Sequence, residues 1–240
     1  MFSSSEALSR VSHELRTPLT AILGFGELLS HDSLSDSQRH SVEQILVGGR
    51  HLLALVEDLL DHSRLAAGPL ELVPVDLRSE IAQSVALLAP QAAEKSLTVE
   101  VEAPESLHVL ADRRRLTQIL LNLISNAIKY NRPGGSITVT AGPDGEGGVR
   151  IEVSDTGIGM TDAQLARLFV PFERLDARLH GIEGNGLGLV VTKALTEAMG
   201  GTIEVAAAPR AGAAFTVRLL ATAAPARAPQ APARALATVA

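Results

Sequence analysis

His13 lies in the stretch VSHELRTPLTAILG, residues 11–24, whose side-chain types suit nucleophilic and proton-transfer chemistry. Glu14 is the next residue in the chain. Arg16 and Thr17 lie three and four residues after His13, and so on the same face of a helix as His13. A carboxylate near one ring nitrogen fixes the imidazole tautomer and makes the other nitrogen more basic. The group predicts a nucleophilic His13 that faces a substrate brought by another domain. The alternative is an ordinary solvated histidine.

Pro18 stands in the interior of the same predicted helix. A proline there removes one backbone hydrogen bond and crowds the carbonyl four residues earlier, at a cost of roughly 3 kcal/mol. That carbonyl belongs to Glu14, beside the histidine. Our hypothesis is that the helix bends or loosens here, so that a second domain can dock at His13 and leave.

A second group of chemical residues lies on the predicted helix of residues 112–131. Asn122 and Asn126 are one turn apart, and Lys129 and Tyr130 follow on nearly the same face. Asparagine is a poor helix former, and an amide oxygen can ligate Mg²⁺ together with phosphate oxygens and water. Lys129 can pair with a phosphate and Tyr130 can lie against a base. A merely polar helix edge is the alternative.

Two glycine motifs suit the same chemistry. DTGIGM, residues 155–160, follows a predicted strand, so Asp155 can accept hydrogen bonds from an exocyclic amine such as that of adenine. Its glycines let the backbone approach a ligand. GNGLGL, residues 184–189, opens a predicted helix and forms a possible phosphate cradle. Each motif is weak alone, and no GxxxxGK[ST] P-loop occurs. The segment between them, residues 167–184, is predicted to be a mobile lid.

Two helices at the N-terminus carry apolar heptad patterns that are typical of a helical bundle. We read one stripe as Leu8, Val11, Leu15, Pro18, Ile22, Phe25 and Leu29, and another as Val42, Ile45, Gly49, Leu52, Val56 and Leu59, widened by Leu46, Leu53 and Leu60. A single antiparallel hairpin cannot bury both stripes, so two hairpins are expected to pair in a homodimer. The alternative is that the stripes pack on the rest of the same chain.

A Gly/Pro-punctuated junction, AAGPLELVPVDL, separates the hairpin from a segment of mixed pattern. We predict helices at residues 77–88, 112–131 and 186–200, and strands at 97–102, 107–111, 136–141, 149–155, 201–207 and 213–220. Strands in series with a few long helices predict helices on one face of a mixed sheet. The Ala/Pro-rich residues 221–240 are predicted to be a disordered tail.

Composition excludes several classes of protein. The chain of 240 residues has no cysteine, hence no disulfide and no thiolate metal site, and its net charge of −6 argues against binding nucleic acid. No apolar run approaches the roughly 18 residues of a membrane span, and no signal peptide is present. We expect a cytoplasmic location, either alone or as the cytosolic part of a larger, membrane-associated system.

The motifs, taken in order, resemble those of sensor histidine kinases of two-component systems. SHELRTPL is similar to their phospho-acceptor box, and NLISNAIKY, DTGIGM, LFVPF and GNGLGL are similar to the N, G1, F and G2 boxes of their GHKL-type ATP-binding domain. The resemblance covers about residues 5 to 220. It implies an α+β fold: a helical hairpin at 1–67 that dimerises into a four-helix bundle, then an α/β sandwich ATP-binding domain at 68–220.

The resemblance also implies roles for single residues. His13 would be phosphorylated, Glu14 would be its general base, and Thr17 would help to dephosphorylate the partner. Asn126 would ligate Mg²⁺ with support from Asn122, and Asp155 would bind adenine. The remaining nucleotide-site residues implied by the match are Lys129, Tyr130, Gly157, Gly159, Arg174, Gly184, Gly186, Leu187 and Gly188.

The implied activity is autophosphorylation of His13 by ATP and Mg²⁺, followed by phosphoryl transfer to an aspartate on a response regulator receiver domain. Asn185 stands where the family often has threonine, which should matter little because both are small and polar. No sensor or receiver domain accompanies the match, so the input would come from elsewhere or through a partner. Two rivals remain: a GHKL ATPase that works as a conformational clamp, which leaves the His13–Glu14 pair unexplained, and a non-catalytic scaffold.

Overall fold

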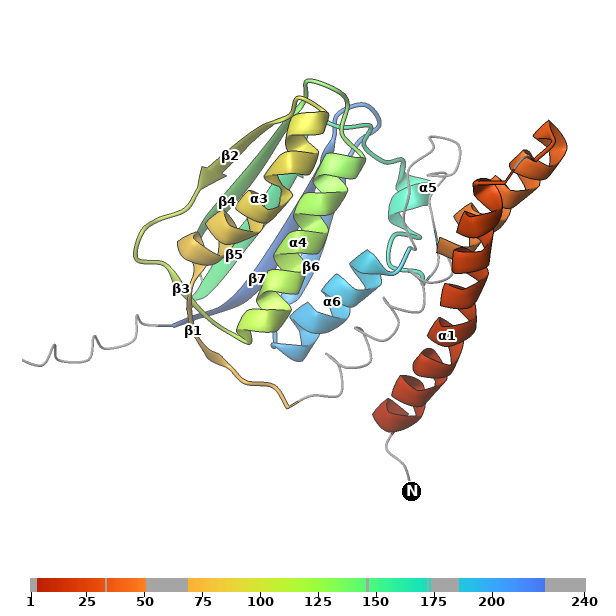
Figure 1. Cartoon of the computed structure of the whole chain (residues 1–240). Helices are drawn as coiled ribbons and strands as arrows, with labels where there is room; N and C mark the ends of the chain where they lie inside the picture. The colour runs from red at the N-terminus through yellow and green to blue at the C-terminus, as the bar shows by residue number, and fades with distance from the viewer. Residues whose placement is uncertain are drawn as a thin grey trace, which may run out of the picture.

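The computed structural model describes residues 4–32, 34–50, 69–145, 147–171, 173 and 186–222, with the backbone alone for residues 4–16 (Figure 1). The helices are α1 (Ser4–Ser30), α3 (Leu77–Glu94), α4 (Arg113–Lys129), α5 (Asp162–Leu165) and α6 (Gly188–Ala198), and residues 36–50 are also helical. The strands are β1 (Val73–Asp76), β2 (Thr98–Glu102), β3 (His108–Ala111), β4 (Ser136–Asp144), β5 (Gly148–Asp155), β6 (Thr202–Ala207) and β7 (Ala213–Thr222).

The N-terminal helices form an antiparallel hairpin with a small core of its own. Leu23 packs against Val42 and Leu46, each less than a tenth exposed. The helices approach closely at two glycines, because a Cβ on Gly26 would press on Leu46 and one on Gly49 would press on Leu23. The pairing of 23 with 49 and of 26 with 46 gives the antiparallel order that the sequence predicted.

A second apolar stripe of the hairpin faces outward. Ile22, Phe25 and Leu29 of the predicted α1 stripe are 48%, 68% and 47% exposed, and Ile45 is 52% exposed. The stripe buried within the hairpin is therefore the one through Leu23, which lies one position away from the predicted α1 stripe. The intrachain contact therefore buries Val42 and Gly49 of the predicted second stripe, whereas Ile22, Phe25 and Leu29 of the predicted α1 stripe stay exposed among the described residues.

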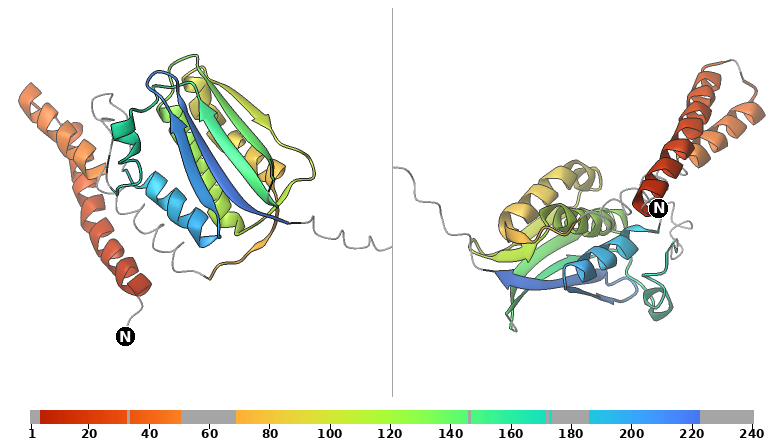
Figure 2. Two further views of the ribbon diagram at one scale, coloured as in Figure 1. Left: turned by 180° about the vertical axis from the view of Figure 1, so that it is seen from behind. Right: turned by 90° about the horizontal axis from the view of Figure 1, so that it is seen from below.

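The strands within the described residues form one sheet in the order β1-β3-β7-β5-β4-β2, with β6 also paired to β7. β2 runs parallel to β4 and the other pairs are antiparallel, so the sheet is mixed, as predicted. Figure 2 shows α3, α4 and α6 together on one face of this sheet. The predicted α+β fold class is thereby confirmed.

The core lies between these helices and the sheet because every second strand residue points toward the helices. Ile137 and Val139 of β4 are fully buried, as are Leu116 and Leu120 of α4, whereas Thr138 between the two β4 residues is only partly buried. Asp112 starts α4 by accepting hydrogen bonds from the backbone of Arg114 and Arg115. This burial fixes the rotation of α4 and turns Asn122 and Asn126 away from the core.

Strand β1 was not predicted from the sequence. Its residues lie in the stretch AAGPLELVPVDL, whose glycine and prolines are typical of a junction between domains. Pro74 lies inside it, and proline is normally a sign against a strand because it cannot donate to the ladder. β1 is the edge of the sheet and pairs with β3 alone, so the missing N–H costs no ladder bond. The short helix α5 was also missed, although Thr161 and Gln164 form a capping box at its start.

The far ends of the predicted domains fall partly outside the described residues. β7 runs through Thr222, past the predicted start of the tail at residue 221, and the rest of that tail is not described. No helix among the described residues is long and apolar enough to cross a membrane.

Candidate active site

Helix α4 carries the first part of the site along the edge that faces away from the core. Asn122, Asn126 and Tyr130 are half-buried there, and Lys129 is exposed. The amide of Asn122 donates to the carbonyl oxygen of Gly188 and, over 2.9 Å, to the hydroxyl of Thr192. Asn122 therefore ties α4 to the first turn of α6.

Asn126 differs from Asn122, one turn away on the same helix. Within the part of the chain that the structure describes, its amide has no hydrogen-bond partner. A half-buried amide without a protein partner suits an external ligand, and its oxygen is the kind of donor that Mg²⁺ accepts.

Asp155 ends β5 and faces the α4 end of the site. Its carboxylate accepts a hydrogen bond from the backbone N–H of Gly157 over 2.7 Å. Burial raises the pKa of Asp155 above its ordinary value, although backbone hydrogen bonds from Gly157 and Ala213 work in the opposite direction. A partly desolvated carboxyl at a strand end is ready to accept a hydrogen bond from a ligand.

Two glycines after Asp155 are required by close backbone approaches. A Cβ on Gly157 would overlap the carbonyl oxygen of Tyr130, and the next residue, Ile158, donates its N–H to that oxygen over 3.1 Å. Gly159 has a φ of +65°, and a Cβ there would overlap the carbonyl of Ala208. The 155–159 loop is thus held between the end of α4 and the β6–β7 turn.

A polar network behind this loop was not recognised in the sequence. Asn131, only 6% exposed, donates to the carbonyl of Ser136 over 3.0 Å and accepts from the hydroxyl of Thr156 over 3.3 Å. The same Thr156 hydroxyl accepts from the N–H of Ser136 over 2.9 Å. An asparagine at a helix end is a weak sequence signal, and the contact partners become apparent only in the fold.

The start of α6 completes the described site. Leu187 precedes the helix and is buried, and Gly188 lies so near Asn122 that a Cβ would overlap its amide. Within the described residues no side chain caps the first turn of α6. Its first N–H groups, next to Gly186, are therefore available to an anion.

The phenylalanine segment after the 155–159 loop packs against α6. The ammonium of Lys193 lies 5.2 Å from the ring centre of Phe169, within cation–π range. Phe169 belongs to the predicted lid of residues 167–184, and the part of that lid from residue 174 onward, with Arg174 and Gly184, lies outside the described residues.

The predicted phospho-acceptor residues lie on α1, which is helical from Ser4 to Ser30 without a break at Pro18. The side chains of His13 and Glu14 are outside the described residues, and Thr17, one turn later, is exposed. The structure thus brings together Asn122, Asn126, Tyr130, Asp155 and Gly188, and it leaves the chemical approach of His13 to that group as a prediction.

Two protein family models match this chain, one for each of its two domains. Residues 111–223, which hold the site around α4 and Asp155, match the family model of histidine kinase-, DNA gyrase B- and HSP90-like ATPases. Residues 3–68, which include the described hairpin, match the family model of the His Kinase A (phospho-acceptor) domain.

Two similar curated proteins are histidine kinases by name. The cell-division control histidine kinase PdhS of Brucella anthropi is 39% identical over 210 residues, which are 81% of this chain and 20% of that protein. PdhS of Brucella suis is 38% identical over 211 residues, again 20% of its length. The chain therefore spans a small part of these relatives.

Solved structures agree. Full-length ShkA, in complex with AMPPNP, superposes with a TM-score of 0.70 at 37% identity, covering 91% of this chain and 46% of that one. Acinetobacter baumannii AdeS gives a TM-score of 0.62 at 25% identity, covering 87% of this chain and 97% of that one. The chain belongs to the sensor histidine kinases, and the resemblance drawn from its sequence motifs is confirmed.

Proposed function

We propose that the chain is an ATP-dependent protein-histidine kinase that phosphorylates its own His13 and passes the phosphoryl group to an aspartate of a response regulator. The proposal is supported by the partly buried Asp155 at the end of β5 and by the Asn126 amide on α4, which has no hydrogen-bond partner among the described residues, in a chain whose α1 also carries the His13–Glu14 pair. A GHKL ATPase that works as a conformational clamp would need the nucleotide site around Asn126 and Asp155, but it would not need the His13–Glu14 pair.

The proposed reaction has two phosphoryl transfers. In the first, one imidazole nitrogen of His13 attacks the γ-phosphorus, a P–N bond forms, the bridging P–O bond breaks, and ADP leaves. Glu14 orients the ring and takes its proton. In the second, an aspartate oxygen of the regulator attacks the same phosphorus and the P–N bond breaks, which returns the imidazole.

Different residues of the proposed site would bind the adenine, the phosphates and the Mg²⁺ ion. Asp155 would accept from the exocyclic amine of adenine, with Tyr130 against the base and Gly157 and Gly159 giving room. Lys129 and Arg174 would face the phosphates, and the glycines at 184, 186 and 188, with Leu187, would form the loop before the uncapped start of α6. The Asn126 amide oxygen would hold Mg²⁺, which supplies positive charge between the phosphates.

The direct test is incubation with γ-labelled ATP and Mg²⁺, followed by acid and base treatment of the labelled chain. A P–N linkage predicts label that survives base and is lost in acid. ATP hydrolysis without any label on the chain would favour the clamp-type ATPase instead.

Asp155→Asn is expected to weaken nucleotide binding and to stabilise the nucleotide-free domain. A hydrogen bond to a charged acceptor contributes about 1.5–3 kcal/mol, so loss of the charge predicts a drop in ADP affinity of roughly 10- to 100-fold. Because the folded pKa is raised, the stability linked to this carboxyl is fully present below its unfolded pKa and is lost as the pH rises through the folded pKa.

At neutral pH the uncharged asparagine should therefore melt at a higher temperature than wild type, and the difference should shrink as the pH is lowered toward the ordinary range of an aspartate. Calorimetric titration with ADP and melting curves at several pH values measure both effects. An unchanged ADP affinity would remove Asp155 from the adenine site.

We also propose that the outward stripe of the hairpin pairs with a second copy in a four-helix bundle. Its apolar side chains are Ile22, Phe25 and Leu29 on α1, with Leu28 at its edge, and Ile45 on the second helix, all about half exposed or more. Single exposed apolar residues are common on proteins, but a contiguous helical stripe of this kind indicates an interface.

Phe25→Glu is expected to convert the dimer to monomer. Burial of a phenylalanine side chain contributes roughly 1.5–3 kcal/mol, and a symmetric interface contains the change twice. Sedimentation at several concentrations measures the dissociation. Leu87→Glu is the matched control, because Leu87 on α3 is 65% exposed, nearly as much as Phe25 at 68%, yet lies outside the hairpin. Equal dissociation in both variants, or in neither, would count against this interface.

A further inference from the structure

Lys95 connects the ends of two helices that lie side by side. Its backbone caps α3, donating its N–H to the carbonyls of Ala92 and Ala93. Its side-chain ammonium donates to two carbonyls in the last turn of α4, that of Ile128 over 3.0 Å and that of Lys129 over 2.7 Å.

The Lys95 ammonium supplies hydrogen bonds and positive charge to the C-terminal end of α4. The last carbonyls of an α-helix have no partner within the helix, and the negative end of the helix dipole favours a cation. Ser96, directly after Lys95, has a φ of +54° and turns the chain away from α3. The carbonyl of Lys95 also accepts the N–H of Gly134 over 3.0 Å, so the same residue holds the loop that follows α4.

The turn held by Lys95 carries much of the proposed nucleotide site. Lys129 and Tyr130 end α4, and Asn126 lies one turn before. The carbonyl of Tyr130 accepts the N–H of Ile158, in the loop that follows Asp155. A shift of the last turn of α4 would therefore move Lys129 and Tyr130 together with the 155–159 loop.

We propose that Lys95 is a positioning residue for the nucleotide, acting through the C-terminal turn of α4 on Asn126, Lys129, Tyr130 and the 155–159 loop. The inference rests on the proposed function, since it presupposes that nucleotide binds there. Displacements of about 1 Å in a supporting group can cost up to 100-fold in function, so an effect on affinity is measurable.

The test variant is Lys95→Met in the full chain, which keeps the length of the side chain and removes its donors. The dissociation constant of Mg²⁺–ADP should rise about tenfold or more. Amide hydrogen exchange at residues 157–159 should become faster. Lys95→Arg keeps donors at this position and should bind Mg²⁺–ADP within about threefold of wild type, and it provides a second variant if Lys95→Met does not fold.

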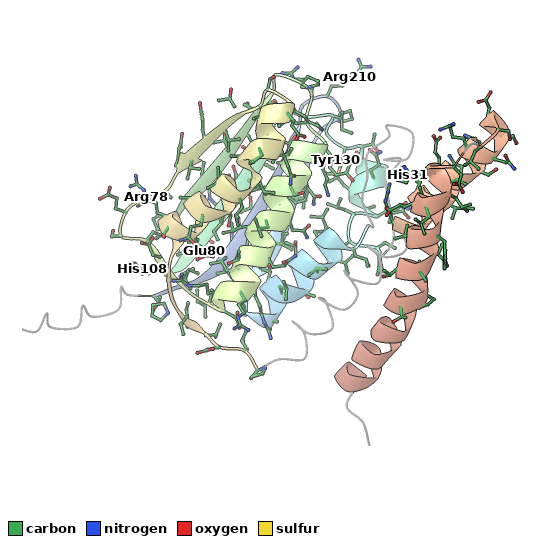
Figure 3. The ribbon with its side chains drawn as sticks, viewed as in Figure 1. His31, Arg78, Glu80, His108, Tyr130 and Arg210 are labelled. Carbon is green, nitrogen blue, oxygen red and sulfur yellow. The ribbon has the colours of Figure 1, made fainter. Side chains whose placement is uncertain are left out.

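Arg113→Met supplies a control for simple loss of stability. Arg113 lies at the other end of α4, where its guanidinium is 3.6 Å from the buried carboxylate of Glu80 on α3. Figure 3 labels Glu80 and Tyr130 at opposite ends of the α3–α4 pair. Arg113→Met should lower the melting temperature while leaving the ADP dissociation constant and the exchange of residues 157–159 unchanged.

Titration in about 0.1 M and about 1 M salt separates positioning from long-range attraction of phosphate. At about 1 M salt the screening length is only about 3 Å, so a purely electrostatic effect of Lys95 would vanish. Persistence of the tenfold ratio supports the proposal, and its disappearance overturns it.

The proposal is also overturned if Lys95→Met binds Mg²⁺–ADP as wild type does while its melting temperature falls. Failure of the wild-type chain itself to bind Mg²⁺–ADP would instead refute the proposed function, and the two results are distinguished by the wild-type titration alone.

Discussion

Replacement of His13 by glutamine is expected to abolish autophosphorylation completely. Glutamine keeps a polar side chain of similar length on α1 but has no nucleophilic nitrogen, because its amide lone pair is delocalised. The γ-phosphoryl group then has no acceptor on the chain. Labelled ATP with acid and base treatment, as above, measures the loss, and Mg²⁺–ADP titration should give an unchanged dissociation constant because the nucleotide site lies in the other domain.

Variants of the neighbouring residues sharpen this prediction. Glu14→Ala should leave the acceptor in place and slow labelling by on the order of 100-fold, the typical effect of removing a positioned general base. Thr17→Ala should leave His13 labelling largely intact, since Thr17 is proposed to position water for dephosphorylation of the regulator. Label that persists on His13→Gln would show that another residue is the acceptor.

Replacement of Asn126 by alanine is expected to reduce autophosphorylation by on the order of 100-fold or more. A metal ion at transferring phosphates contributes several kcal/mol to stabilisation of the transition state, and the amide oxygen of Asn126 is its proposed protein ligand. The change removes a side chain without a protein partner in the described residues, so the melting temperature of the nucleotide-free chain should stay close to that of wild type.

Asn122→Ala is the matched comparison for Asn126→Ala. The amide of Asn122 is already engaged with Gly188 and Thr192, so its loss should lower the melting temperature and weaken ADP with and without Mg²⁺. Asn126→Ala should instead lose only the part of the affinity that depends on Mg²⁺, measured by titration with Mg²⁺ and with EDTA. Near-normal autophosphorylation of Asn126→Ala would refute the metal assignment.

Several parts of the fold were predictable because their signals are local. The apolar face of α4 follows from the spacing of Leu116, Ile119, Leu120 and Leu123, which demands burial on one side whatever the partner is. The alternation in β4 and β5 likewise fixed which residues face the helices. Glycine motifs next to a strand end and a helix start indicated a nucleotide site. Glycine has no side chain, so the backbone at these positions can come close to a ligand.

Other features depended on which segments meet, and local patterns carry little information about that. β1 contains Pro74 and reads as a junction, yet it is a strand because its position at the sheet edge leaves the missing N–H without consequence. In the hairpin, the heptad pattern did not reveal which stripe is internal. Close approach at Gly26 and Gly49 selected Leu23, and the predicted stripe through Phe25 stayed outside.

The amino-acid sequence alone determined the family, the order of its chemical motifs and the periodicity of its main elements, because these depend on residue type and spacing along one chain. Only the tertiary structure distinguished the two asparagines of α4, one bound to Gly188 and one without a partner among the described residues, and placed the ammonium of Lys95 on the carbonyls of Ile128 and Lys129. Hydrogen bonds between residues about 30 or more positions apart depend on how helices and sheet pack, and packing is a property of the whole domain rather than of any local segment.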